Sequence, residues 1–122
     1  MRTLPRLLGA ATALYSIAIM IKPALLARPC GLTTTPGGSE VTMPVAVLIR
    51  AIGARDVAIG TAMVCAPRGS ALRAATAARV AADAADAVVF GVQLAEPDRR
   101  MKIAGFAAGW ALLCALSSRW AG

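Results

Sequence analysis

The 122-residue sequence has no histidine, only five aromatic residues and an odd number of cysteines. Without histidine the chain lacks the commonest metal ligand and the usual general base near neutral pH. The three cysteines, Cys30, Cys65 and Cys114, have no C-x-x-C spacing, which indicates neither a zinc site nor a disulfide framework. We therefore expect no metal and no cofactor, and the role of Cys30 is left open.

The sequence is rich in long apolar segments. It is 58% hydrophobic with a mean hydropathy of +0.68, in a length typical of one domain. No alternating strand pattern is present, and apolar segments occur at about 7–26, 43–66, 71–95 and 101–120. Short turns join the later segments. The sequence therefore predicts an all-α fold, an antiparallel four-helix transmembrane bundle forming one integral membrane domain over residues 1–122.

The segment ends carry recognisable signals. Pro23 is expected to bend or end the first helix, and a polar loop should run from residue 28 to 42. Pro44 suits a first helical turn, and Ser70 is a candidate N-cap. The first segment has 15 uncharged residues from Leu7 to Ile21, fewer than the ~20 of a full span. A signal peptide is the alternative, but the absence of an A-x-A cleavage site favours a retained helix.

The net charge of +7 is concentrated at the ends of the apolar segments. Basic flanks of this kind are attracted to anionic head groups, so membrane lipid is an expected partner. Nucleic acid is not, because the few aromatic residues are scattered and no basic polar face is present. We predict a multi-pass protein of the plasma (inner) membrane. Basic residues are balanced between its two sides, and the distribution of acidic residues favours both termini in the cytoplasm.

Six charged residues lie inside the second and third apolar segments: Arg50, Arg55, Asp56, Arg79, Asp83 and Asp86. Ionised groups at membrane depth are costly and usually face the protein interior. At 100° per residue the last three share one stripe of the third segment, which Thr76, Phe90 and Gln93 extend. The tight hairpin at residues 67–70 predicts opposite partners at nearly equal depth, in the pairs Arg50–Asp86, Arg55–Asp83 and Asp56–Arg79. Arg79 and Asp83 are also four apart and can pair.

These charges carry the functional hypotheses. In the first, the network binds an amphiphilic or lipid-like molecule, with Arg50, Arg55 and Arg79 as ligand-binding candidates. Asp56, Asp83 and Asp86 are then catalytic candidates for acid–base chemistry such as epoxide opening or isoprenoid-type cyclisation. The alternatives are a non-enzymatic accessory or structural subunit whose ion pairs set helix register, a proton-coupled transporter acting as an oligomer, and a soluble bundle.

Small residues mark candidate helix contacts. Gly105 and Gly109 form a G-x-x-x-G on the fourth segment, and Ala54, Ala58 and Ala62 form a ridge on the second. Packing within the bundle is the favoured interpretation, and a homo-oligomer is the alternative.

One motif resembles a known family. The stretch Arg50-x-x-Gly53-x-Arg55-Asp56-x-x-x-Gly60, followed by Arg79-x-x-x-Asp83-x-x-Asp86, is similar to a family of small uncharacterised four-helix bacterial membrane proteins, distantly DoxX-like. The likeness extends from about residue 6 to 120. It implies a four-helix membrane fold and no particular activity.

Overall fold

The structure is a computed structural model that describes residues 3–94 and 97–120, and all of its regular elements are helices. In chain order they are α1 (Leu4–Ile21), α2 (Ala24–Cys30), α3 (Met43–Cys65), α4 (Ser70–Gln93), α5 (Pro97–Ser117) and the short 3₁₀ helix η1 (Ser118–Trp120). The predicted all-α class is therefore confirmed, with five α-helices in place of four.

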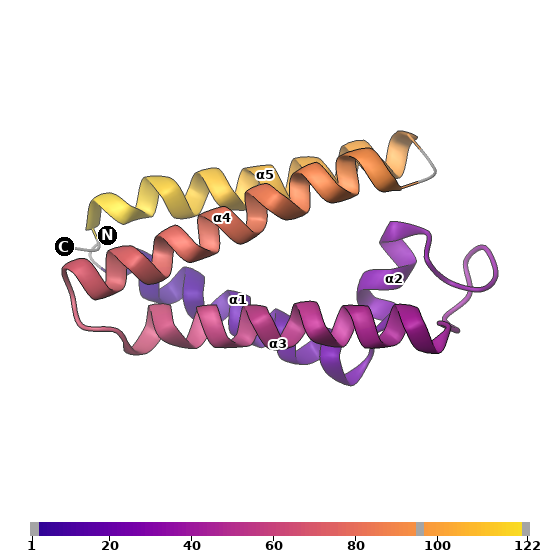
Figure 1. Cartoon of the computed structure of the whole chain (residues 1–122), viewed down its shortest axis with the longest axis horizontal. Coiled ribbons are helices and arrows are strands. Elements are labelled where there is room, and N and C mark those ends of the chain that lie inside the picture. Colours follow the sequence, from indigo (N-terminus) through magenta and orange to yellow (C-terminus); the bar gives the residue numbers. More distant parts are fainter. Residues whose placement is uncertain (1–2, 95–96, 121–122) are drawn as a thin grey trace.

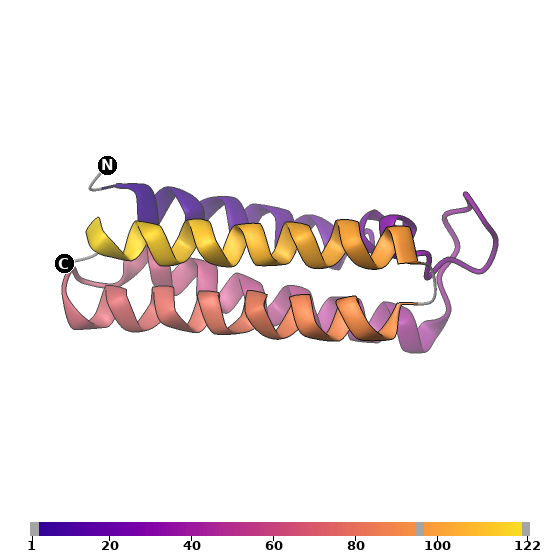
Figure 2. The same cartoon turned by 90° about the horizontal axis from the view of Figure 1, so that it is seen from above.

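The long helices form two antiparallel pairs. Helix α1 packs along α3, and α4 packs along α5. Figure 1 shows that the pairs meet at the end that holds both termini and diverge toward α2. Seen from above, α5 lies on the α1 side and α4 on the α3 side (Figure 2). Contacts between α3 and α4 join the two pairs.

Proline and glycine explain several helix ends that differ from the sequence prediction. Helix α1 begins earlier than expected and stops at Ile21, because Pro23 cannot donate a backbone hydrogen bond. The chain turns helical again in α2, so the expected loop from residue 28 begins only after Cys30. Gly31 ends α2 in the left-handed region at φ +71° and donates its N–H back to that helix.

The remaining boundaries differ by a few residues. Pro44 lies in the first turn of α3 as predicted. The hairpin after α3 is also confirmed, but Gly69 at φ +104° is the N-cap of α4 and Ser70 is its first helical residue. Pro97, expected in a turn, begins α5, which is a favourable place because its missing N–H has no partner there. Residues 95 and 96 lie outside the described part of the chain.

The contact between α1 and α3 is made through glycines. A Cβ added to Gly60 would lie 2.5 Å from the carbonyl oxygen of Gly9, and one added to Gly9 would lie 2.5 Å from Cβ of Met63. Gly53 likewise lies against Ser16 and Met20 of α1. Two positions of the sequence motif are therefore glycine because the backbones approach closely, as in small-residue membrane interfaces.

The favoured interpretation of the two small-residue ridges, packing within the bundle, is wrong. Ala54, Ala58 and Ala62 are exposed, and α3 turns its glycine face to α1 instead. A Cβ at Gly105 or Gly109 would meet nothing within 4 Å. Packing inside the chain therefore does not explain either ridge.

The interior holds polar side chains beside apolar ones such as Ile49, Met63 and Leu72, whereas many other large apolar side chains are exposed. Charged and hydroxyl side chains are buried, namely Thr12, Ser16, Asp56, Thr76, Arg79, Asp83 and Ser117. Large apolar side chains lie outside along the helices, among them Leu7, Leu14, Ile21, Met101, Phe106 and Leu112. Within residues 3–94 and 97–120, two segments, Leu4–Ile21 and Pro97–Trp120, are long and apolar enough to cross a membrane. Two of the four expected spans thus have the length and composition to cross a membrane.

Arginines satisfy the last carbonyls of neighbouring helices. Arg6, in the first turn of α1, donates to Val64 O and, at 3.0 Å, to Ala66 O at the end of α3. Arg50 of α3 donates from Nε to Met20 O at 3.1 Å, near the end of α1. The final carbonyls of a helix have no partner within it and carry partial negative charge, so a guanidinium there stabilises the helix end.

The same arrangement occurs at two other ends. Arg99 of α5 donates from Nη1 to Arg28 O at 2.8 Å and to Pro29 O at 3.0 Å in the last turn of α2. Arg68, in the hairpin, donates to Trp120 O at 2.7 Å at the end of η1. Basic residues at segment ends thus connect helices to one another, in addition to the lipid contact predicted for them.

Candidate functional site: an ion-pair network between α3 and α4

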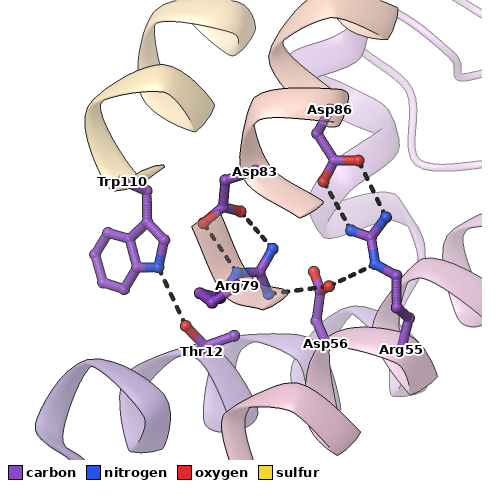
Figure 3. Close-up of polar contacts among 7 residues, drawn as sticks. All are labelled: Thr12, Arg55, Asp56, Arg79, Asp83, Asp86 and Trp110. Carbon is purple, nitrogen blue, oxygen red and sulfur yellow. Dashed lines mark hydrogen bonds and ion pairs between the residues drawn. The ribbon is translucent and has the colours of Figure 1, made fainter. Parts of the chain in front are cut away.

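Five of the six charged residues predicted from the apolar segments meet between α3 and α4 (Figure 3). Helix α3 contributes Arg55 and Asp56, and α4 contributes Arg79, Asp83 and Asp86. Three carboxylates therefore face two guanidinium groups, and the group carries a net charge of −1 when every member is ionised.

Arg79 occupies the innermost position. Its Nε donates to Asp83 Oδ2 at 2.9 Å, and its Nη2 donates to the other oxygen of the same carboxylate. Its Nη1 lies 3.0 Å from Asp56 Oδ1 but lacks a hydrogen bond of good angle. The predicted pairs Arg79–Asp83 and Asp56–Arg79 are both confirmed.

Arg55 makes the outer part of the network. It donates from Nη1 and Nη2 to the two oxygens of Asp86, at 3.2 Å and 2.8 Å, and from Nε to Asp56 Oδ1 at 2.8 Å. The forked contact to Asp86 is the geometry in which a guanidinium binds a carboxylate most specifically. Asp56 Oδ1 receives both arginines, so this one oxygen connects the inner and outer parts.

Exposure increases from the inner to the outer part. The side chain of Arg79 is 1% exposed and that of Asp83 is 9%, whereas Asp86 is 18% and Arg55 is 35% exposed. Arg55 and Asp86 form the outer pair of the network (Figure 3). Arg79 and Asp83 are thus sealed between the helices, and Arg55 and Asp86 remain partly reachable.

Two of the predicted pairs are wrong. Arg50 is exposed and donates to the end of α1, so Asp86 pairs with Arg55 in its place. Asp83 pairs with Arg79 of its own helix and not with Arg55. The reason is the long arginine side chain: Arg55 reaches about one helical turn along α4 beyond the residue at its own depth. Arg50 points to α1 because it lies on the face that carries Gly53.

The polar stripe predicted on α4 is correct in part. Thr76 is fully buried one turn before Arg79, and its hydroxyl donates to Leu72 O at 2.9 Å. Phe90 is half-buried and Gln93 is exposed, because α4 has separated from α3 at that depth. The stripe therefore faces the interior only as far as Asp86.

One polar contact was missed from the sequence. Trp110 Nε1 of α5 donates to Thr12 Oγ1 of α1 at 3.2 Å and ties the two helix pairs together on the side away from α3 (Figure 3). Thr12 and Ser16 are four residues apart and both buried. Their spacing could have predicted a polar contact, because residues i and i+4 of an apolar helix lie on the same face.

The cysteines do not contribute to a site. Cys30 is 3% exposed, and burial raises the pKa of its thiol to about 11, against an opposing effect of Arg99. A thiol of this kind is protonated and unreactive at neutral pH. Within residues 3–94 and 97–120, no group of three or more His, Cys, Asp or Glu side chains is placed to hold a metal ion.

Comparisons with known proteins return no relative. No family description, curated protein or solved structure matches the chain. The resemblance to small DoxX-like membrane proteins therefore stays a prediction.

Proposed function

We propose that this chain is a small integral membrane protein that binds an amphiphilic molecule at the network between α3 and α4. The membrane placement is supported by two observations: Asp56, Arg79 and Asp83 are buried, and many large leucine, isoleucine and valine side chains are exposed. Contiguous apolar surface of this extent is a liability in water and is what a bilayer solvates.

The observation that carries the binding proposal is the graded exposure of the network. Arg79 and Asp83 fix the relation of α3 to α4, while the Arg55–Asp86 pair is partly accessible. Asp56 Oδ2 has no hydrogen-bond partner within the described residues and can accept another bond. A polar head that approaches between the diverging helices meets these groups first, and its tail lies against the apolar outer surface.

The charge of the network selects the head group. With three carboxylates against two guanidinium groups, added donors are favoured and added anions are repelled. A hydroxyl or ammonium head supplies donors to the remaining carboxylate lone pairs. We therefore assign the ligand to long-chain alcohols or amines in preference to fatty acids or phosphates.

The proposal is for binding and not for catalysis. Each of Asp56, Asp83 and Asp86 contacts at least one guanidinium group. Each candidate catalytic carboxylate is therefore already engaged by an arginine, and none is kept only for a substrate.

The test uses two probes of equal chain length, dodecanol and dodecanoate. Native mass spectrometry of the protein in maltoside micelles should show dodecanol bound and dodecanoate absent. Binding should weaken in Asp86→Asn and persist in Arg50→Gln, a matched control outside the network. Equal retention of both probes, or of dodecanol by both variants, would refute the assignment.

A second function is favoured by the closure of the network: each charge has a partner of opposite sign, as in an element that only sets helix register. In that case the double variant Arg55→Gln/Asp86→Asn should regain stability lost by each single variant. If the double variant regains stability and the wild type binds neither probe, the network serves to set helix register and not to bind a ligand.

A further inference from the structure

A second polar site lies at the end of the bundle that carries α2. A pocket of about 350 Å³ is enclosed between the last turn of α2, the loop that follows it and the first turn of α5. Its lining includes Arg28, Thr33, Gly37, Gly38 and Arg99, and among the residues that the structure describes it holds no acidic side chain. This volume is at the lower end of the ~300–1,000 Å³ usual for small-molecule sites.

The two arginines are held in different ways. Arg99 is fixed because its Nη1 donates to Arg28 O at 2.8 Å and to Pro29 O at 3.0 Å. Its aliphatic part lies on Gly31, where an added Cβ would be 2.9 Å from Arg99 Cδ. The side chain of Arg28 is exposed, and in the described ranges no hydrogen bond or ion pair engages its guanidinium group.

The loop contributes polar groups and close backbone approach. Gly37 adopts φ +73°, whereas the hydroxyl of Thr33 donates its one hydrogen to Thr35 O at 2.9 Å and has none left for an anion. Two guanidinium groups beside glycine backbone, with no acidic residue among the described residues of the lining, complement an oxyanion with several acceptor atoms. Carboxylate and phosphate both match the arginine fork, but phosphate offers more oxygens to two guanidinium groups.

We propose that this pocket binds a phosphate group, with Arg28 as the adjustable ligand and Arg99 as the fixed one. The site is separate from the α3–α4 network, and its test does not depend on an amphiphile binding there. If α1 and α5 cross the bilayer, the pocket lies at head-group level. The phosphate is then supplied either by an anionic lipid or by a soluble phosphate ester.

The test compares Arg28→Gln with Arg73→Gln. Arg73 is also exposed, but it lies in the first turn of α4 at the opposite end of the molecule. Inorganic phosphate is titrated by calorimetry into each purified protein, and phosphatidylglycerol binding is followed by native mass spectrometry. Loss of one charge-assisted hydrogen bond should weaken binding about ten-fold in Arg28→Gln. The Arg73→Gln protein should bind like the wild type.

Each outcome decides the proposal. Binding of both probes, weakened only by Arg28→Gln, supports a general phosphate site. Selective loss of phosphatidylglycerol identifies a lipid head group, and selective loss of inorganic phosphate identifies a soluble ester. Absence of binding, or equal weakening by both variants, overturns the proposal. Helical circular dichroism of both variants should match the wild type, because neither side chain supports the fold.

Discussion

An alanine at position 60 is expected to force α1 and α3 apart. Its Cβ would lie 2.5 Å from the carbonyl oxygen of Gly9 and 2.9 Å from the amide nitrogen of Ala13. Both are backbone atoms of α1, so no side-chain rotation can relieve the clash. The two helices must separate, and the apolar contacts along the whole pair weaken with them.

The magnitude follows from two opposing effects. Overpacking at a tight contact costs about 1–3 kcal/mol, and two backbone clashes place this site near the upper end. Alanine stabilises a helix by about 1 kcal/mol relative to glycine. Gly60→Ala should therefore lower the free energy of unfolding by about 2 kcal/mol. Gly105→Ala, on α5 with nothing within 4 Å, should raise it by about 1 kcal/mol.

The assay is thermal unfolding of the protein in maltoside micelles, followed by the helical circular dichroism signal. The two variants make the same chemical change in two helices, so their difference of about 3 kcal/mol isolates the packing effect. If Gly60→Ala is as stable as Gly105→Ala, then α1 and α3 do not cross at Gly60.

Two further predictions concern single side chains. Arg79→Met leaves buried carboxylates uncompensated and should cost about 3–5 kcal/mol, whereas Arg50→Gln removes one hydrogen bond and should cost about 1 kcal/mol; equal losses in the unfolding assay would contradict the network. Burial raises the pKa of Cys30 from 9.0 to about 11, so the stability contributed by its neutral thiol is complete below pH 9 and is lost as the pH rises to about 11. Unfolding measured against pH should show a smaller fall in Cys30→Ala than in the wild type.

The sequence was sufficient to predict the four long helices and the inner part of the charged stripe. Apolar length and the Pro67–Gly69 turn predicted the α3–α4 hairpin, and the spacing of Arg79, Asp83 and Asp86 predicted one inward face. These features depend on the spacing of residues along the chain, which the sequence shows directly even when the helix crossing angles are unknown. For the same reason the pair of Arg79 with Asp83, four residues apart, was predictable.

The partners across the hairpin depended on information that the sequence does not contain. Whether Asp86 meets Arg50 or Arg55 is decided by the rotation of α3, and that rotation is set by glycines packing on α1. The glycines were visible in the motif, but their neighbours in space were not. Helix α2 was missed because seven residues between Pro23 and Gly31 give too short a pattern to recognise.

In each helix pair, one helix is apolar and the other carries part of the ion-pair network. Helices α1 and α5 are the two with the length and composition of a membrane span, and each packs along a helix that carries the network, α1 on α3 and α5 on α4. The charged faces of α3 and α4 then turn toward each other. An isolated α4 with Arg79, Asp83 and Asp86 would be costly in hydrocarbon, whereas α4 paired with α3 buries those charges with opposite partners. Under the proposed membrane placement, we expect α3 and α4 to insert only as the network forms, with the apolar helices α1 and α5 beside them.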